Sequence, residues 1–84
     1  MTVRVLVVDD HPVVRGGVIG VLRGHTGLEV VGEASTAAEA IALGRSTRPD
    51  VVLCDLRMGP GGDGVDVTKA LRESDSGPAV VILT

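Results

Sequence analysis

The stretch VRVLVVDDHP, residues 3–12, decides the fold. Residues 3–8 are nearly all apolar or β-branched, which is typical of a strand that is buried on both faces of a parallel sheet. Asp9 and Asp10 follow directly, and Pro12 then stands where the first turn of a helix tolerates a missing N–H donor. The stretch therefore predicts a buried strand, two carboxylates at its carboxyl end, and a helix that begins immediately afterwards.

The rest of the chain repeats this alternation of strands and helices. Apolar side chains recur at helical spacing up to about residue 23, at Val14, Val18, Val21 and Leu22. Further strands are predicted at 28–34, 51–55 and 79–83, with a second helix ending near residue 46 and a third helix patterned by Val65, Thr68, Leu71 and Arg72. Alternating elements with short links favour an α/β fold with a parallel sheet and right-handed crossovers. A chain of 84 residues supports one small domain of this kind.

Polar residues mark where the second and third helices begin. Thr36 and Glu39 have the spacing of a capping box, and Asp63 is expected to cap the third helix. The second helix also has a narrow face of small residues, which favours close packing: Ala37, Ala40, Ile41 and Gly44.

Composition and charge exclude several classes of function. Eight Lys and Arg are outnumbered by eleven Asp and Glu, and no basic stripe is present, so this segment is not expected to bind nucleic acid directly. The apolar run before Asp9 is too short for a signal peptide or a membrane span. Cys54 is the only cysteine, which excludes an internal disulfide. It is expected to be a buried small hydrophobe in a reduced, cytoplasmic protein.

Four side chains that carry chemistry are placed at strand ends. Asp9 and Asp10 follow the first strand, Asp55 closes the third and Thr84 closes the fourth. Each has a purely structural interpretation when taken alone, as a helix cap, a turn residue or a strand residue. Together they predict one site, because ligands of open parallel sheets bind at the carboxyl ends of the strands. Clustered carboxylates need a cation, and an all-oxygen set suits Mg²⁺.

These motifs resemble a known family. The opening VLVVDDHP of residues 5–12, the stretch VVGEA of residues 30–34 and the stretch PDVVLCDLRM of residues 49–58 are similar to receiver domains of NarL/FixJ (LuxR-type) response regulators. Residues 63–65, DGV, resemble the turn before the third helix of these domains. The resemblance implies a flavodoxin-like (CheY-like) doubly wound parallel sheet in which the strands are ordered 2-1-3-4.

The resemblance also implies a function and a role for each site residue. Asp55 would accept a phosphoryl group from the phosphohistidine of a sensor histidine kinase, and Thr84 would hydrogen-bond the attached group. Mg²⁺ would be held by the carboxylates of Asp10 and Asp55 and the backbone carbonyl of Arg57, with Asp9 supporting through water. Such a module is not an enzyme in its own right, and in the family it normally controls a fused DNA-binding transcription regulator.

Two departures from the family pattern affect these expectations. Gly59 lengthens the loop after Asp55, so that Pro60 stands five residues beyond it instead of four. Family members have five strands and five helices, whereas this sequence stops after the fourth strand. We therefore expect residues 1–84 to lack the C-terminal part of the receiver, including the phosphate-binding lysine of its fifth strand, and any DNA-binding domain. Lys69 is expected to be a surface charge on the third helix and not a substitute for that lysine.

Alternative functions remain at this point. The apolar strand at 79–83 would be an exposed sheet edge, which predicts a homo-oligomer, and the chain could be a degenerate receiver that acts only by oligomerising. An aspartyl-nucleophile phosphatase is the enzymatic alternative, although such enzymes separate two aspartates by one residue, whereas Asp9 and Asp10 are adjacent. His11 neighbours the acidic pair and could titrate near neutral pH, but its position favours a partly exposed residue at the start of a helix.

Overall fold

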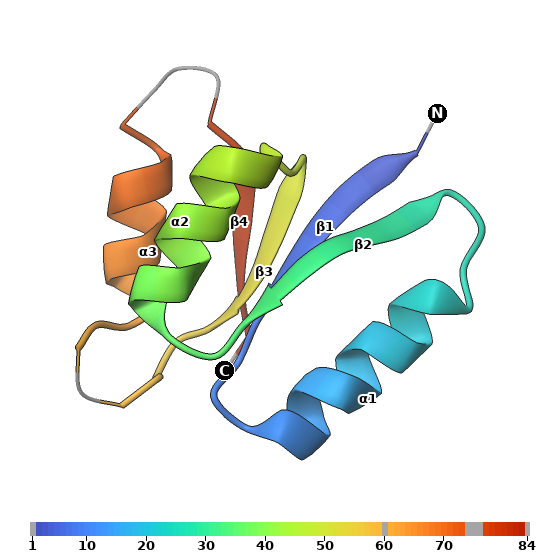
Figure 1. Ribbon diagram of the computed structural model, residues 1–84, viewed down its shortest axis with the longest axis horizontal. Helices are drawn as coiled ribbons and strands as arrows, with labels where there is room; N and C mark the ends of the chain where they lie inside the picture. Colours follow the sequence, from blue (N-terminus) through green and yellow to red (C-terminus); the bar gives the residue numbers. More distant parts are fainter. Residues whose placement is uncertain (1, 60, 74–76, 84) are drawn as a thin grey trace.

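The computed structural model describes residues 2–59, 61–73 and 77–83, and in these ranges the predicted alternation of strands and helices is confirmed (Figure 1). The elements follow one another in the order β1 (Val3–Val8), α1 (Pro12–Arg23), β2 (Leu28–Ala34), α2 (Ala37–Thr47), β3 (Val51–Asp55), α3 (Gly64–Leu71) and β4 (Ala79–Leu83). All four predicted strands have the expected bounds, and α2 ends one residue beyond the expected Ser46.

The strands form one parallel sheet in the order β2-β1-β3-β4, as expected. Val8 at the end of β1 pairs with Ala34 of β2 and with Cys54 of β3. The pairing continues beyond the strands, because the backbone N–H of Asp9 donates to the carbonyl of Ala34 at 3.0 Å. In-register parallel strands bring their carboxyl ends to the same edge of the sheet, so the residues that follow β1 and β3 lie side by side there.

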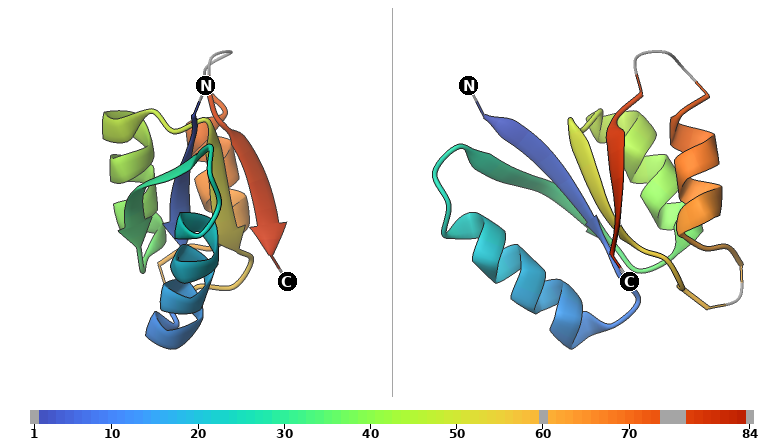
Figure 2. Two further views of the ribbon diagram at one scale, coloured as in Figure 1. Left: turned by 90° about the vertical axis from the view of Figure 1, so that its right-hand side faces the viewer. Right: turned by 180° about the vertical axis from the view of Figure 1, so that it is seen from behind.

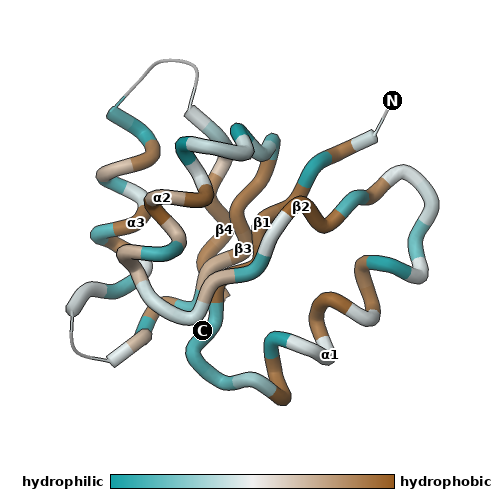
Figure 3. The backbone as a smooth tube through the Cα atoms, in the orientation of Figure 1, coloured by the Kyte–Doolittle hydropathy of each residue, from teal (hydrophilic) through white to brown (hydrophobic). Residues whose placement is uncertain are grey.

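The helices cover the two faces of the sheet, with α1 on one face and α2 and α3 on the other (Figures 1 and 2). Alternate residues of β1 divide between the two cores: Leu6 and Val8 pack with α2 and α3, whereas Val5 and Val7 pack with Ile19 of α1. Apolar residues are concentrated along the strands between these layers (Figure 3). The molecule is therefore doubly wound, as the resemblance implied.

Only part of the apolar spacing that predicted α1 is buried in the structure. Ile19 is the buried residue of this helix, and Val18 and Leu22 are partly buried. Val14 and Val21, which belong to the same apolar spacing, are 51% and 65% exposed. The periodicity of α1 leaves this ambiguous, because valines occupy several sides of the helix and only its position over the sheet decides which of them is buried.

The pattern that predicted α3 is also only partly buried, whereas the small-residue face of α2 is packed as expected. In α3, Val67 and Leu71 are buried and Val65 is 45% exposed. The small-residue face of α2 packs closely against α3, because a Cβ atom placed on Gly44 would lie only 2.6 Å from a methyl group of Leu71. Glycine at this position therefore allows the two helices to approach one another.

The two edges of the sheet are β2 and β4. Among the described strands, β4 pairs only with β3, and Val81 and Leu83 of β4 are exposed. Lys69 lies in the last turn of α3 and is exposed, as predicted. None of the helices in the described ranges combines the length and hydropathy that a bilayer crossing requires.

Candidate functional site

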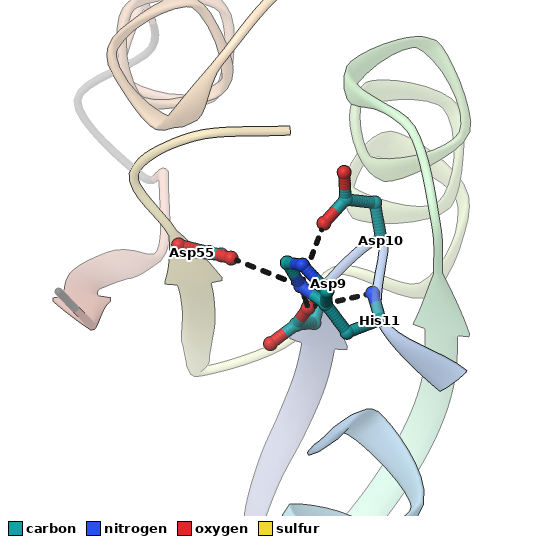
Figure 4. A group of neighbouring side chains, drawn as sticks. All are labelled: Asp9, Asp10, His11 and Asp55. Carbon is teal, nitrogen blue, oxygen red and sulfur yellow. Dashed lines mark hydrogen bonds and ion pairs between the residues drawn. The ribbon is translucent and has the colours of Figure 1, made fainter. Parts of the chain in front are cut away.

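Three of the predicted site residues come together at the carboxyl edge of the sheet. Asp9 and Asp10 follow β1, and Asp55 is the last residue of β3. One ligand-type atom from each of these residues and from His11 lies within 4.8 Å of the others (Figure 4). We call these four residues the acidic pocket. Thr84, the fourth predicted member of the site, lies outside the described residues.

Asp9 forms the buried floor of the acidic pocket. Its Oδ1 atom accepts hydrogen bonds from the backbone N–H of His11 at 2.8 Å and from Nδ1 of the same residue at 2.9 Å. Its backbone carbonyl accepts from the guanidinium of Arg15 at 2.7 Å, and Nε of Arg15 also bonds the carboxylate of Glu33 at 3.0 Å. Because α1 and β2 both contribute to these contacts, the position of Asp9 is fixed by the fold.

One carboxylate oxygen of Asp10 is buried without a hydrogen-bond partner. Its Oδ1 atom is buried and accepts no hydrogen bond, although Nδ1 of His11 lies 2.9 Å away. An imidazole nitrogen has at most one hydrogen, so when Nδ1 donates to Asp9 its short contact with Asp10 is not a hydrogen bond. A buried carboxylate oxygen without a partner is costly, and a cation within the pocket would satisfy it.

Asp55 lies opposite the acidic pair, and its side chain is 22% exposed. Its Oδ1 atom accepts a hydrogen bond from the backbone N–H of Arg57 at 3.3 Å, while Oδ2 lies 3.7 Å from Nδ1 of His11. Oδ2 thus points toward the acidic pair, as Figure 4 shows. A divalent cation at this point would contact carboxylates from both strands, and the hard oxygen donors suit Mg²⁺.

His11 is the member of the pocket whose contacts the sequence did not predict. It is the N-cap residue of α1, as its position suggested, but its side chain makes no capping hydrogen bond and turns toward the carboxylates. The hydrogen bond to Asp9 and the charge of Asp10 raise the pKa of His11 above its ordinary value. The adjacency of His11 to the acidic pair was the available signal, but the direction of the side chain depends on the folded backbone.

Gly59, which follows β3, lies beside the acidic pocket. The inserted Gly59 adopts a φ of 76°, a conformation that favours glycine, and a Cβ atom at this position would lie 3.8 Å from Oδ2 of Asp10. Asp63 is the N-cap of α3, as predicted, and forms a capping box with Asp66. The backbone N–H of Gly64 donates to the carbonyl of Leu56 at 3.0 Å. The described residues on either side of position 60 thus place Gly59 beside Asp10 and hold the start of α3 near the end of β3.

The sequence and fold of the chain match those of a known family. Residues 5–84 match the family model of the response regulator receiver domain. The chain belongs to this receiver family. It is 42% identical to the transcriptional regulatory protein LiaR of Bacillus subtilis over 98% of this chain and 38% of that protein. The chain therefore spans well under half the length of that relative.

Two further similarities show the range of proteins in which such receivers occur. A LuxR-family two-component response regulator from Aurantimonas sp. has a solved structure that superimposes with a TM-score of 0.88 and 40% identity, covering 98% of this chain and 58% of that one. A protein-glutamate methylesterase/protein-glutamine glutaminase of Anaeromyxobacter dehalogenans is 42% identical over 95% of this chain and 23% of its own length. The resemblance to NarL/FixJ receivers is confirmed, and the chain is a module of two-component phosphorelay signalling.

Proposed function

We propose that Asp55 accepts a phosphoryl group from the phosphohistidine of a sensor histidine kinase while Mg²⁺ occupies the acidic pocket. The ion would be held by the carboxylates of Asp10 and Asp55 and by the backbone carbonyl of Arg57, with Asp9 supporting through water. The proposal rests above all on the buried Oδ1 atom of Asp10, which has no hydrogen-bond partner beside two other carboxylates. The bound ion would neutralise charge on the transferring oxygens.

The surroundings of the three carboxylates favour Asp55 as the nucleophile. Asp9 is buried and already accepts two hydrogen bonds from His11, so its oxygens are held in place. Asp55 is at the end of β3 with Oδ2 directed into the pocket, and Arg57 holds its other oxygen. In the transfer, an oxygen of Asp55 would form a bond to phosphorus as the bond between phosphorus and the histidine nitrogen of the kinase breaks.

The remaining role belongs to Thr84, whose hydroxyl we propose to hydrogen-bond the phosphoryl group on Asp55. The residue directly before it, Leu83, pairs with Asp55 in the register of β3 and β4, and the carbonyl of Leu83 accepts from the backbone N–H of Leu56 at 3.3 Å. Residue 84 follows a strand end that is next to the proposed phosphoacceptor. A phosphoryl group adds roughly 1.5 to 2 negative charges and strong acceptor oxygens, which would attract this hydroxyl.

Phosphorylation can be tested with the 84-residue chain, Mg²⁺ and a small-molecule phosphodonor such as acetyl phosphate. Intact mass spectrometry should show one added phosphoryl group, and peptide mapping should place it on Asp55. Asp55→Asn should abolish the adduct, whereas Asp63→Asn, which preserves the helix cap, should retain it. An equal adduct in Asp55→Asn, or no adduct on folded wild-type protein, would contradict the proposal.

We further propose that residues 1–84 are the first part of a receiver whose complete protein regulates transcription through a fused DNA-binding domain. The name of the relative LiaR, a transcriptional regulatory protein, supports this, and the chain spans 38% of its length. We propose that the module itself is not an enzyme and that it acts in the cytoplasm, where the thiol of Cys54 would stay reduced. The phosphatase alternative has no specific support, because the candidate nucleophile lies on β3.

A second candidate function is self-association of the chain through the edge strand β4. Val81 and Leu83 are exposed on this edge strand, and an apolar edge with free backbone groups is a template for pairing with a second copy of the chain. Sedimentation equilibrium of the wild-type chain should show dimers or larger species, and Val81→Lys should shift them to monomer. A folded wild-type monomer at high micromolar concentration would refute self-association.

A further inference from the structure

The side chain of His11 contacts all three carboxylates of the acidic pocket. Its Nδ1 atom lies 2.9 Å from Oδ1 of Asp9, 2.9 Å from Oδ1 of Asp10 and 3.7 Å from Oδ2 of Asp55. It is the one nitrogen among the four ligand-type atoms that gather there. The donor set offered by these side chains is therefore three oxygens and one imidazole nitrogen.

The spacing of these atoms resembles that of ligands around one ion. In an octahedral complex with bonds of about 2.1 Å, neighbouring ligand atoms lie about 3.0 Å apart and opposite ones about 4.2 Å apart. The two distances of 2.9 Å from Nδ1 match neighbouring ligands, and the distance of 3.7 Å to Asp55 lies between the two values. Small side-chain movements would thus place Nδ1 and the carboxylates around a common cation.

The ring of His11 has room to move toward an ion. Its side chain is 64% exposed and does not cap α1, so among the described residues its ring interacts only with the carboxylates of the pocket. Its backbone N–H donates to Oδ1 of Asp9 at 2.8 Å. This bond fixes the backbone beside the acidic pocket, while the exposed ring can still rotate. The Oδ1 atom of Asp10, which has no hydrogen-bond partner, lies 2.9 Å from Nδ1 of His11, so one cation could contact both atoms.

We propose that Nδ1 of His11 is a direct ligand of the divalent ion in the acidic pocket. Binding requires Nδ1 to release the hydrogen that it shares with Asp9 to solvent, so that the bound ring is neutral and carries its hydrogen on Nε2. The inference rests on the proposed metal binding of this pocket and adds the identity of a further ligand and its consequence for selectivity. Carboxylate oxygens suit Mg²⁺ and Mn²⁺, whereas imidazole suits first-row transition metals such as Ni²⁺ and Zn²⁺. His11 therefore shifts the selectivity of the pocket toward Ni²⁺ and Zn²⁺ relative to a pocket of oxygen donors alone.

The decisive experiment is electron spin echo envelope modulation of the folded 84-residue chain loaded with Mn²⁺, because a directly bound imidazole nitrogen modulates the echo of this ion. The wild-type chain should show ¹⁴N modulation, and His11→Gln should lose it while still binding Mn²⁺. His25 is the only other histidine of the chain and lies in the turn after α1, so His25→Gln is the matched control and should keep the modulation. Calorimetry should show Ni²⁺ affinity reduced about tenfold or more in His11→Gln, with Mg²⁺ affinity changed less than about threefold.

The outcomes separate this inference from the proposal on which it rests. Stoichiometric Mn²⁺ binding without ¹⁴N modulation, or modulation that persists in His11→Gln, would overturn the role of His11 and leave the carboxylate site intact. Failure of folded wild-type protein to bind Mn²⁺ at all would refute the metal site and the inference together.

Discussion

Gly64 is the first residue of α3 and packs against the end of β3, and replacing it with alanine should damage the fold next to the acidic pocket. A Cβ atom at this position would lie 2.9 Å from the carbonyl oxygen of Asp55, 3.2 Å from Cα of Leu56 and 3.0 Å from a methyl group of Ile82. Two of these atoms belong to the backbone and cannot rotate away. Overpacking of this kind costs about 1–3 kcal/mol, and the strain falls on the residue proposed to accept the phosphoryl group.

Urea denaturation followed by far-UV circular dichroism would measure this effect. A loss of about 1–3 kcal/mol is a large part of the stability of a domain of this size, for which roughly 4–12 kcal/mol is expected. It should lower the Tm by roughly 5–20 °C. Gly17→Ala is the matched control, because no atom lies within 4 Å of the added methyl group and α1 should gain about 0.5–1 kcal/mol. If both variants denatured at the same urea concentration, the close approach at Gly64 would be refuted.

Contacts of Cys54, His11 and Asp63 have further measurable consequences. Cys54 is fully buried and burial raises the pKa of its thiol to about 11, so a thiol reagent at neutral pH should react with it slowly in the native protein and rapidly in urea; equal rates would contradict this. The hydrogen bond to Asp9 raises the pKa of His11 above 6.5, so its contribution to the stability of the metal-free fold is fully present below pH 6.5 and is lost as the pH rises through the raised value. Urea midpoints should therefore fall over this range in wild-type protein and vary less in His11→Gln, and parallel curves would refute the effect. Asp63→Ala should lose about 1 kcal/mol of stability in urea denaturation through loss of the α3 cap, and no loss would contradict the capping assignment.

The strands could be predicted from the sequence more reliably than the faces of the helices. A strand covered on both faces, such as β1, needs apolar residues at every position, and this pattern is distinct from that of a surface helix. In α1 and α3, valines occupy several sides of the helix, so the sequence does not indicate which side faces the sheet. The structure buries Ile19 and Val67 and exposes Val21, because the direction in which each helix crosses the sheet decides which side is covered.

The meeting of Asp9, Asp10 and Asp55 could be predicted because it follows from topology. Residues that end neighbouring parallel strands must lie close together whatever their side chains do. The contacts of His11 could not be predicted in this way, since they depend on one side-chain rotamer at the start of α1. The unpartnered oxygen of Asp10 also emerges only from three-dimensional geometry, because it depends on where the single hydrogen of the imidazole points.

The central claim is that the acidic pocket binds a divalent cation, and calorimetric titration of Mg²⁺ into the metal-free chain tests it most directly. We expect one ion per folded wild-type chain and an affinity lowered by about tenfold or more in Asp10→Asn, with Asp63→Asn unchanged. Folded wild-type protein that takes up no Mg²⁺, or an Asp10→Asn variant that binds it as tightly as the wild type, would contradict the account.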